Sequence, residues 1–419
     1  MIDLKKLKAD IDSYKQVLKD RNLKIDLDEF LDLDKKRLEL QSQIDELKNK
    51  RNIVSKEIPK LAPSEKQMKI EEMKKVGDEI TCHETTITSI EERWTYIYHR
   101  LPNFLDSTTA IGPDDSGNKV ESKYKDPTKF DFAPKTHYEI GEKKGWIDTE
   151  KGAQISGARF WYIKGDLALL NMAIINYAVN KLNSRGFQYI LPPVLVREEA
   201  MFGTGFLPAG EDGVYRVNPE EDNLYLVGTA EVPVTSYHAG EILNLNSPIK
   251  YVGQSSCFRR EAGSYGKDMK GILRGHQFEK VEMVVFCKQE DSQKMHNEMV
   301  AVEEEVWQGL GIPYQKVNIC SGDLGNPALK KYDLEAWMPG EGKYREVTSC
   351  SNVGEYQSRR LGIRYKDEEG NTKYAHTLNG TVIALSRCLI AVIENYQTVD
   401  GNVIIPEILR PYIGGRTEI

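Results

Sequence analysis

The sequence predicts an α+β protein in which an N-terminal helical hairpin precedes a body built on a mostly antiparallel β-sheet flanked by helices. Apolar residues recur at alternating steps of three and four between residues 30 and 101. Beyond residue 101, segments with apolar residues at helical spacing are interspersed with short segments in which apolar and polar residues alternate as in strands. Those strands follow one another without the strand–helix–strand alternation of a parallel sheet. A chain of 419 residues has room for two or three domains.

The hairpin is predicted from two narrow apolar seams, which the helices can bury only against each other. The first seam comprises Phe30, Leu33, Arg37, Leu40, Ile44, Leu47, Arg51, Val54, Ile58 and Leu61. The second comprises Met73, Val76, Ile80, His83, Ile87, Ile90, Trp94, Ile97 and Leu101. Between them, Ala62 to Lys66 predicts a turn, because Pro63 cannot continue a helix. An antiparallel coiled coil of roughly 45–50 Å is expected at about 1.5 Å per residue.

The far end of the hairpin is basic. From Lys48 to Lys69, seven basic residues face only Glu57 and Glu65, a local balance of +5. A run of this kind is more often a solvated helix face. A projecting rod with a basic end could also reach a long polyanion, and the residues expected to do so are Lys48, Lys50, Arg51 and Lys56. A dimerisation coiled coil is a further alternative, although an intramolecular hairpin has already used its seam.

The body is predicted to begin where the heptads end, at Leu101-Pro102-Asn103, which divides the chain into domains 1–103 and 104–419. A helix is expected over residues 169–182, ending before Gly186. Phe187 to Val196 is predicted to be one strand, at a sheet edge because of Pro192 and Pro193. Neither a P-loop nor a strand-coupled GxGxxG is present, so a nucleotide must be held in another way.

Composition excludes several classes. No stretch approaches the roughly 18 apolar residues of a membrane span, and the net charge of −7 speaks against a protein that coats nucleic acid with its whole surface. Six cysteines are scattered without a CxxC pair, so neither a disulfide framework nor a zinc site is expected. The N-terminus mixes acidic and basic residues and lacks an apolar core. We therefore expect a mature, cytoplasmic protein.

The strongest chemical pattern is a strand at 257–261, a glycine-containing loop at 262–273 and a return strand at 274–282. Alternation predicts Arg259 and Glu261 on one strand face, and Phe278 and Glu282 on one face of the return strand. An arginine suits a phosphate, a carboxylate accepts from an exocyclic amine, and a ring can stack on a base. Together they could hold ATP against an amino acid. Arg259 and Glu261 alone would suit a surface ion-pair ladder. The loop glycines Gly263, Gly266 and Gly271 favour nucleotide binding over an ion-pair ladder.

Three further segments carry polar residues within apolar patterns. Thr229 and Glu231 are predicted on one strand face after Leu224 and Leu226. Glu346 and Ser349 offer oxygen ligands of the kind Mg²⁺ prefers, but three residues apart they need a bulge or a strand end to meet. Arg387 opens an apolar run, which is costly unless it meets an anion, and an internal ion pair is an equal alternative.

As an ordered set, these residues resemble the class II aminoacyl-tRNA synthetases, and specifically the seryl-tRNA synthetases of bacterial type, over essentially the whole chain. The segments that carry the resemblance are 51–52, 101–103, 203–205, 229–233, 258–266, 276–278, 280–282, 332–335, 345–346, 349–352, 376–380 and 394–397. One departure is visible, because Thr381 to Ser386 is bulkier than the family's usual serine and glycines after Asn379-Gly380.

The resemblance implies a class II catalytic domain at 104–419 and a homodimer whose interface includes the strand ending at Pro193. It implies that L-serine is bound by Thr229, Ala230, Glu231, Arg259, Glu282, Asn379 and Thr381. It implies that ATP is bound by Arg259, Arg260, Glu261, Gly275, His276, Gln277, Phe278, Glu346, Val347, Thr348, Ser349 and Arg387. Mg²⁺ would lie at Glu346 and Ser349. The arm would grip the long variable arm of tRNA(Ser), and use of tRNA(Sec) is left open.

The expected reaction is activation of serine to seryl-adenylate, followed by transfer to tRNA. Catalysis would be electrostatic, with Arg259, Arg387 and Glu282 as its residues and no protein nucleophile. One alternative is a paralogue that loads an amino acid onto a carrier protein, which would not need the arm. Another is a non-catalytic RNA-binding scaffold, which would not need to keep Arg259, Glu282 and Arg387 together.

Overall fold

A computed structural model describes residues 1–262 and 270–419. By their contacts they form two compact units, the hairpin (Leu23–Leu101) and the body (Met1–Asn22 with Pro102–Ile419). Residues 1–22 therefore group with the body, and the division at residue 103 stays a prediction. In the described ranges, no helix has the length and apolar character needed to span a membrane.

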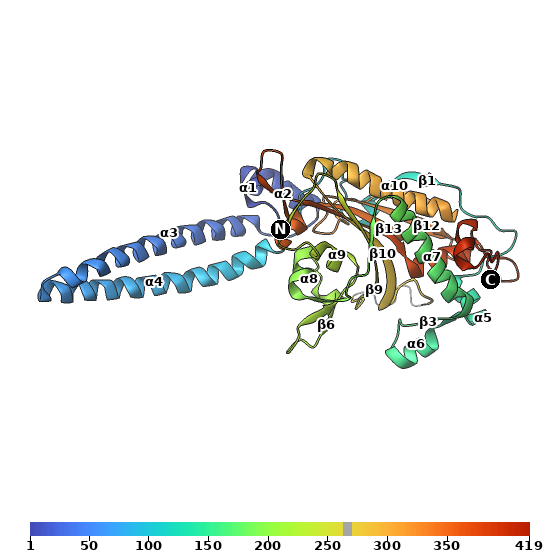
Figure 1. Cartoon of the computed structure of the whole chain (residues 1–419), viewed down its shortest axis with the longest axis horizontal. Coiled ribbons are helices and arrows are strands. Elements are labelled where there is room, and N and C mark those ends of the chain that lie inside the picture. Colours follow the sequence, from blue (N-terminus) through green and yellow to red (C-terminus); the bar gives the residue numbers. More distant parts are fainter. Residues whose placement is uncertain (263–269) are drawn as a thin grey trace. The chain divides into compact units, whose positions relative to one another are not determined.

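The hairpin consists of α3 (Leu27–Glu57) and α4 (Pro63–Tyr98), joined through a 3-10 turn at Ile58–Lys60 (Figure 1). The Asp26 carboxylate caps α3 by accepting from the Glu29 amide. Helix α4 begins inside the predicted turn, because proline at the first helical position lacks only an N–H that has no partner there. The predicted seam is confirmed by one cluster of its residues, Leu47, Val54, Ile58, Met73, Val76 and Ile80.

The body begins with two short helices, α1 (Leu4–Ala9) and α2 (Ile11–Asp20). The Tyr14 hydroxyl donates to the Pro102 carbonyl over 2.7 Å. Arg21 is only 3% exposed and donates to four main-chain carbonyls of residues 104, 324, 325 and 328. These bonds fasten both chain segments that flank the hairpin into the body.

The largest sheet in the described part of the chain has eight strands, in the order β1-β11-β12-β13-β16-β10-β9-β4. Their bounds are β1 Lys119–Tyr124, β4 Gln188–Ile190, β9 Ile249–Phe258, β10 Gln277–Cys287, β11 Tyr314–Asn318, β12 Lys330–Met338, β13 Lys343–Gly354 and β16 His376–Ala384. Every neighbouring pair is antiparallel except β4 with β9. The predicted, mostly antiparallel sheet is confirmed.

Strand β10 shows how the two sides of this sheet differ. Val281, Met283 and Val285 join a large apolar core with three helices, whereas Val284 and Phe286 belong to a second core with α9. The three helices are α7 (Gly165–Ser184), α10 (Ser292–Leu310) and α12 (Leu385–Asn395). Because side chains alternate along a strand, the even-numbered polar residues at the start of β10 face away from this helical layer.

Smaller elements complete the body. The helices are α5 His137–Lys143, α6 Thr149–Ser156, α8 Glu198–Thr204, α9 Glu231–Ser236 and α11 Tyr356–Leu361. The strands are β2 Ile147–Asp148, β3 Tyr162–Ile163, β5 Leu195–Arg197, β6 Tyr215–Val217, β7 Leu224–Leu226, β8 Ile242–Leu243, β14 Arg364–Lys366 and β15 Thr372–Tyr374.

Two predicted strands are wrong in detail. Phe187 to Val196 is split into β4 and β5, which belong to different sheets, because Pro192 and Pro193 lie between them and cannot donate to a ladder. The edge position is nevertheless confirmed, since β4 is the last strand in the sheet order. Thr229 and Glu231 do not lie on a strand, because β7 ends at Leu226 and α9 begins at Glu231.

Candidate functional site

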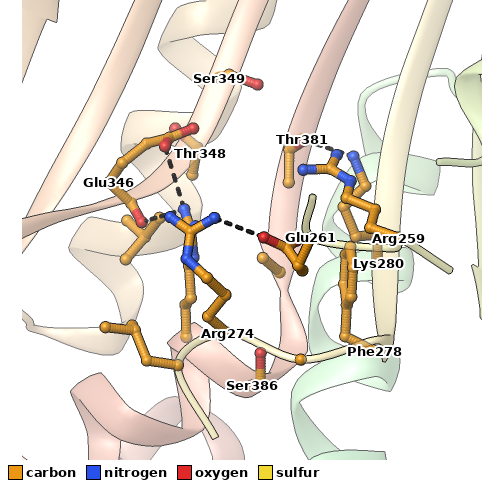
Figure 2. Close-up of a pocket in the computed structure, with 15 residues that line it drawn as sticks. Arg259, Glu261, Arg274, Phe278, Lys280, Glu346, Thr348, Ser349, Thr381 and Ser386 are labelled. Carbon is orange, nitrogen blue, oxygen red and sulfur yellow. Dashed lines mark hydrogen bonds and ion pairs between the residues drawn. The ribbon is translucent and has the colours of Figure 1, made fainter. Parts of the chain in front are cut away.

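Two cavities lie beside β10, and they share part of their lining. We call one the arginine cavity, because Arg259, Arg274 and Arg387 line it (Figure 2). We call the other, of about 490 Å³, the carboxyl cavity, because Glu231 and Glu282 line it. Arg259, Lys280 and Ser349 line both. The predicted ATP residues and the predicted serine residues therefore gather at adjoining places.

Arg259 and Glu261 both line the arginine cavity, but not by strand alternation. Strand β9 ends at Phe258, and Glu261 has a φ of +51°, which breaks the predicted pattern. The Arg259 amide still donates to the His276 carbonyl over 3.0 Å. Glu261 accepts from Arg274 over 2.7 Å (Figure 2). The alternative of an ion pair at this place is present in part, because Glu261 pairs with Arg274.

Part of the predicted glycine loop, Gly263 and Gly266, lies outside the described residues. Gly271 is described and has a φ of +73°. A Cβ there would come within 2.0 Å of His137 Nε2, which accepts a hydrogen bond from the Ile272 amide. A glycine is therefore required where this loop returns to β10.

On β10, Phe278, Lys280 and Glu282 follow one another at every second position, as predicted for Phe278 and Glu282. The Arg259 guanidinium lies 5.3 Å from the centre of the Phe278 ring. Lys280 Nζ lies 2.8 Å from Glu282 Oε2 and 3.2 Å from the Thr381 hydroxyl. This line of side chains runs from an aromatic surface to a buried ion pair.

A bulge in β13 brings Glu346 and Ser349 to the same cavity, as their spacing in the sequence required. Leu334 pairs with Thr348 and Glu335 with Glu346, which leaves Val347 as the extra residue of β13. Glu346 and Ser349 consequently line the same cavity. Arg387, on α12, donates to the Glu346 carbonyl over 2.7 Å and lies 3.2 Å from its carboxylate. The predicted alternative of an internal ion pair for Arg387 is thus present.

The pKa of Glu346 reflects this setting. Partial loss of hydration raises it, but the positive charges of Arg387 and Lys331 outweigh this and lower the pKa to about 2. The side chain of Glu346 is 46% exposed. An ionised, accessible carboxylate and the Ser349 hydroxyl, which lines the same cavity, are oxygen ligands of the kind that Mg²⁺ prefers. In residues 1–262 and 270–419, no group of three or more His, Cys, Asp or Glu side chains could hold a metal ion.

The carboxyl cavity contains two acidic side chains held by amides and hydroxyls. Glu282 is 2% exposed and accepts from the Thr381 hydroxyl over 3.0 Å. Glu231 accepts from Gln357 over 2.7 Å and from Asn379 over 2.9 Å, both at Oε1. Thr229 accepts from the Glu231 amide over 3.2 Å.

The part of this cavity around Glu231 favours a cation, although Arg259, Lys280 and Lys331 also line the cavity. Burial and the nearby negative charge of Glu282 raise the pKa of Glu231 to about 7. A positively charged group bound between the two carboxyls would lower that pKa again. The cavity is therefore suited to a small ligand with an ammonium group and a hydrogen-bonding group.

The remaining predicted residues are placed less centrally. Ala230 is fully buried, and Arg260 is exposed, with its amide donating to Gly213. His276 Nδ1 lies 2.9 Å from the Arg259 carbonyl, so it supports that turn. Gln277 lines a neighbouring cavity with Phe160 and Trp161. The other predicted ATP residues, Gly275, Val347 and Thr348, line the arginine cavity.

The four predicted basic tip residues all lie on α3. Lys48 lies 2.7 Å from Glu84, and Lys50 lies 3.1 Å from Glu72. Within the described ranges, neither Arg51 nor Lys56 forms an ion pair. Two of the four charges are therefore already partly neutralised within the hairpin.

Sequence reasoning missed several residues of the site, among them Lys280 and Arg274, which line the cavities, and Gln357, which binds Glu231. Lys280 could have been found, because it lies between Phe278 and Glu282 at the same alternation. Arg274 lies in the segment predicted as the return strand, but its pairing with Glu261 depends on the path of the loop. Gln357 holds Glu231 from α11 and carried no sequence signal, because the two are 126 positions apart.

Comparisons with known proteins agree in the family they indicate. A family model described as the seryl-tRNA synthetase N-terminal domain matches residues 1–105. Another, described as the tRNA synthetase class II core domain (G, H, P, S and T), matches residues 215–396.

Relatives match over the whole length. The serine–tRNA ligase of Treponema denticola is 42% identical over 419 residues, covering 99% of both chains. That of Thermodesulfovibrio yellowstonii is 43% identical, also with 99% of both covered. The crystal structure of seryl-tRNA synthetase from Pyrococcus horikoshii complexed with ATP has a TM-score of 0.90 at 36% identity, covering 100% of this chain and 99% of that one.

Proposed function

We propose that this chain, which belongs to the seryl-tRNA synthetase family, activates L-serine with ATP to form seryl-adenylate and pyrophosphate and then transfers the seryl group to tRNA. The observation that carries this proposal is the shared wall of the two cavities. A cavity whose two carboxyls suit an ammonium group meets a cavity whose arginines suit phosphates, and the two share Arg259, Lys280 and Ser349. A carboxylate and an α-phosphate could meet at such a place.

Serine would occupy the carboxyl cavity. Glu231 and Thr229 would bind its ammonium group, with Ala230 supplying only main chain. In the described part of the structure, both contacts of the Glu282 carboxylate are made by Oε2, which leaves Oε1 to accept from the substrate. Asn379 and Thr381 would complete the wall by orienting the two carboxyls.

ATP would occupy the arginine cavity, with its adenine against Phe278 and near Glu261. Arg259 would contact the α-phosphate and thereby stabilise the charge that develops as the serine carboxylate attacks it. No protein nucleophile is needed, because the substrate carboxylate is itself the nucleophile. Arg260, Gly275, His276 and Gln277 would support the adenosine part through the turn that carries Arg259.

The Arg387–Glu346 pair offers a way to receive the rest of the triphosphate. Both side chains are partly exposed, at 24% and 46%, so the pair can open without stranding a buried charge. Arg387 would turn to the γ-phosphate, and Glu346 and Ser349 would hold Mg²⁺. The bound ion would offset negative charge on the phosphates.

The hairpin would bind tRNA(Ser) through its basic end, with Lys48, Lys50, Arg51 and Lys56 near phosphates. Each contact would release about one counterion and make binding sensitive to salt. Charging of tRNA(Sec), which the sequence leaves open, can be decided by aminoacylation of that tRNA.

A homodimer and a cytoplasmic location are also proposed. The apolar side chains of Tyr189, Leu191 and Leu195 around the edge strand are 40%, 69% and 42% exposed, which supports an interface there. The six cysteines are free thiols, as suits a reducing compartment.

Serine-dependent ATP–pyrophosphate exchange, with and without tRNA, tests the central proposal. Exchange with serine and subsequent charging of tRNA are expected. Exchange without charging would favour the carrier-protein alternative, and absence of both would favour the non-catalytic one.

The hairpin's role is tested by replacing residues 30–101 with a short flexible linker. Exchange is expected to stay nearly intact while transfer to tRNA falls steeply, because every proposed catalytic residue belongs to the body. The Tyr14–Pro102 hydrogen bond should keep the body's flanking segments together in this variant. Loss of exchange in a folded variant would contradict the separation.

A further inference from the structure

Glu303 is a buried carboxyl group to which the proposed reaction assigns no role. It lies on α10 and is 1% exposed. Its Oε2 accepts from the Thr348 hydroxyl over 3.0 Å, while Oε1 has no hydrogen-bond partner among the described residues. A buried carboxyl group with only one hydrogen-bonded oxygen lowers the stability of the fold, so its presence calls for a physical reason.

A slot on the far side of the sheet accommodates this carboxyl. A Cβ at Gly380 would come within 2.7 Å of Glu303 Oε1 and within 3.3 Å of Cys350 Sγ. Gly380 lies on β16 between Asn379 and Thr381, whose side chains contact the two acids of the carboxyl cavity. Glu303 therefore sits beneath the strand that forms the serine wall.

The hydroxyl that Glu303 holds lies at the bulge of β13. Thr348 donates to Glu303 and accepts from the Leu334 amide over 3.2 Å. Leu334 and Thr348 are the last regular pair before Val347 bulges out. The hydroxyl thus joins β12, β13 and α10 at the position where alternation is interrupted, and in the sequence Thr348 lies between Glu346 and Ser349, all three of which Figure 2 labels.

We propose that Glu303 is a positioning residue for the ATP site: through Thr348 it holds the Val347 bulge that brings Glu346 and Ser349 onto the same cavity. The inference rests on the proposed binding of ATP with Mg²⁺ there. Without the bulge, strict alternation would place Glu346 and Ser349 on opposite faces of the sheet.

The protonation state of Glu303 suits this role. Burial raises the pKa of this carboxyl well above its usual range. A neutral acid can accept from Thr348 without placing a charge in the apolar core. Glutamine retains the acceptor and the shape, whereas leucine retains only the bulk.

The test compares Glu303→Leu, Thr348→Val and Glu303→Gln with the wild-type chain, using equilibrium dialysis of ATP over a range of Mg²⁺ concentrations. In the Leu and Val variants the half-saturating Mg²⁺ concentration is expected to rise at least fivefold. The KM for serine in pyrophosphate exchange should stay within twofold, because Glu231 and Glu282 are untouched. Glu303→Gln should remain within twofold of wild type in both.

Two further variants separate positioning from general stability. Val306→Ala, a fully buried change on the same helix, should lower the melting temperature without moving the Mg²⁺ dependence. The double variant Glu303→Leu/Thr348→Val should be no worse than the poorer single variant, because both act through one hydrogen bond.

The proposal is overturned if the Leu and Val variants bind ATP with wild-type Mg²⁺ dependence, if their effects multiply, or if Val306→Ala shifts the dependence equally. Should Glu303→Leu not fold, Glu303→Met, which also lacks the acceptor, takes its place, because Thr348 itself lines the arginine cavity. Failure of the proposed function is distinguishable, because it would show as ATP binding by the wild type without serine-dependent exchange.

Discussion

The charges of the hairpin and those of the two cavities are organised in opposite ways. Lys50 and Glu72 of the hairpin are 52% and 38% exposed and 3.1 Å apart. Lys280 and Glu282 of the body are 8% and 2% exposed and 2.8 Å apart. Exposed ion pairs contribute little to folding stability and exchange partners easily. Breaking a buried ion pair, in contrast, leaves an uncompensated charge in the interior. Substitutions in the cavities should therefore cause large losses of activity, whereas substitutions in the hairpin should weaken tRNA binding in small steps.

The largest effect should be rejection of alanine in place of serine. The buried groups of this cavity are placed to hydrogen-bond a substrate hydroxyl. When the substrate lacks that hydroxyl, Glu282 loses a hydrogen bond, and such a loss typically costs about 10⁴-fold or more in kcat/KM. Threonine should be excluded by space. Pyrophosphate exchange with the three amino acids measures this. Equal exchange with alanine and serine would show that Thr229, Glu231 and Glu282 do not form the serine pocket.

The next effect is that of Arg387→Ala, which tests whether the pair with Glu346 serves folding or phosphate binding. Activation should fall by about 2–4 kcal/mol of transition-state stabilisation. The melting temperature of the ligand-free protein should change by only a few degrees, because Glu346 is accessible enough to be hydrated. A large loss of stability with near-normal exchange would refute the phosphate assignment.

Serine affinity should depend on pH through Glu231. With its pKa near 7, this carboxyl is mostly protonated at pH 6, and the serine ammonium favours the ionised form. The KM for serine should fall by up to about tenfold per unit as pH rises towards 7 and then level off. In Glu231→Gln the slope should disappear. An unchanged slope in that variant would assign the titration to another group.

The same shift has a consequence for stability. The unfolded chain releases this proton near the ordinary glutamate pKa, whereas the folded chain keeps it up to about pH 7. The contribution of Glu231 to the stability of the ligand-free protein should therefore decrease as pH rises through that window. Urea titrations of the wild type and Glu231→Gln at pH 5 and 8 check the sign.

The smallest effects are expected at the hairpin tip, where matched pairs sharpen the comparison. Arg51→Ala/Lys56→Ala should weaken tRNA binding more than Lys48→Ala/Lys50→Ala, because the latter two charges already pair with Glu84 and Glu72. Each lost phosphate contact should lower the slope of log K against log salt by roughly one. If all four residues are replaced and the slope does not change, the tip does not contact tRNA.

Much of the fold was predictable, because it follows from local patterns. The seam of the hairpin, the helix ending near Gly186 and the edge position imposed by Pro192 and Pro193 each depend on residues close together in the chain. The predicted single strand through those prolines and the predicted strand at Thr229 and Glu231 were wrong. In the first case the two prolines interrupt the strand, and in the second helix α9 begins at Glu231. In both cases these local features outweighed the pattern of apolar positions.

By itself, the sequence determined the residue types that reach the site: arginines for phosphate, carboxylates for an ammonium group, and an aromatic ring on the same strand. Only the tertiary structure decided how they pair. Glu261 meets Arg274 through the path of a loop, Glu231 acquires its raised pKa from burial beside Glu282, and Thr348 beside the bulge meets Glu303 of α10. These outcomes depend on residues that are distant in the chain, whose packing no local periodicity can specify.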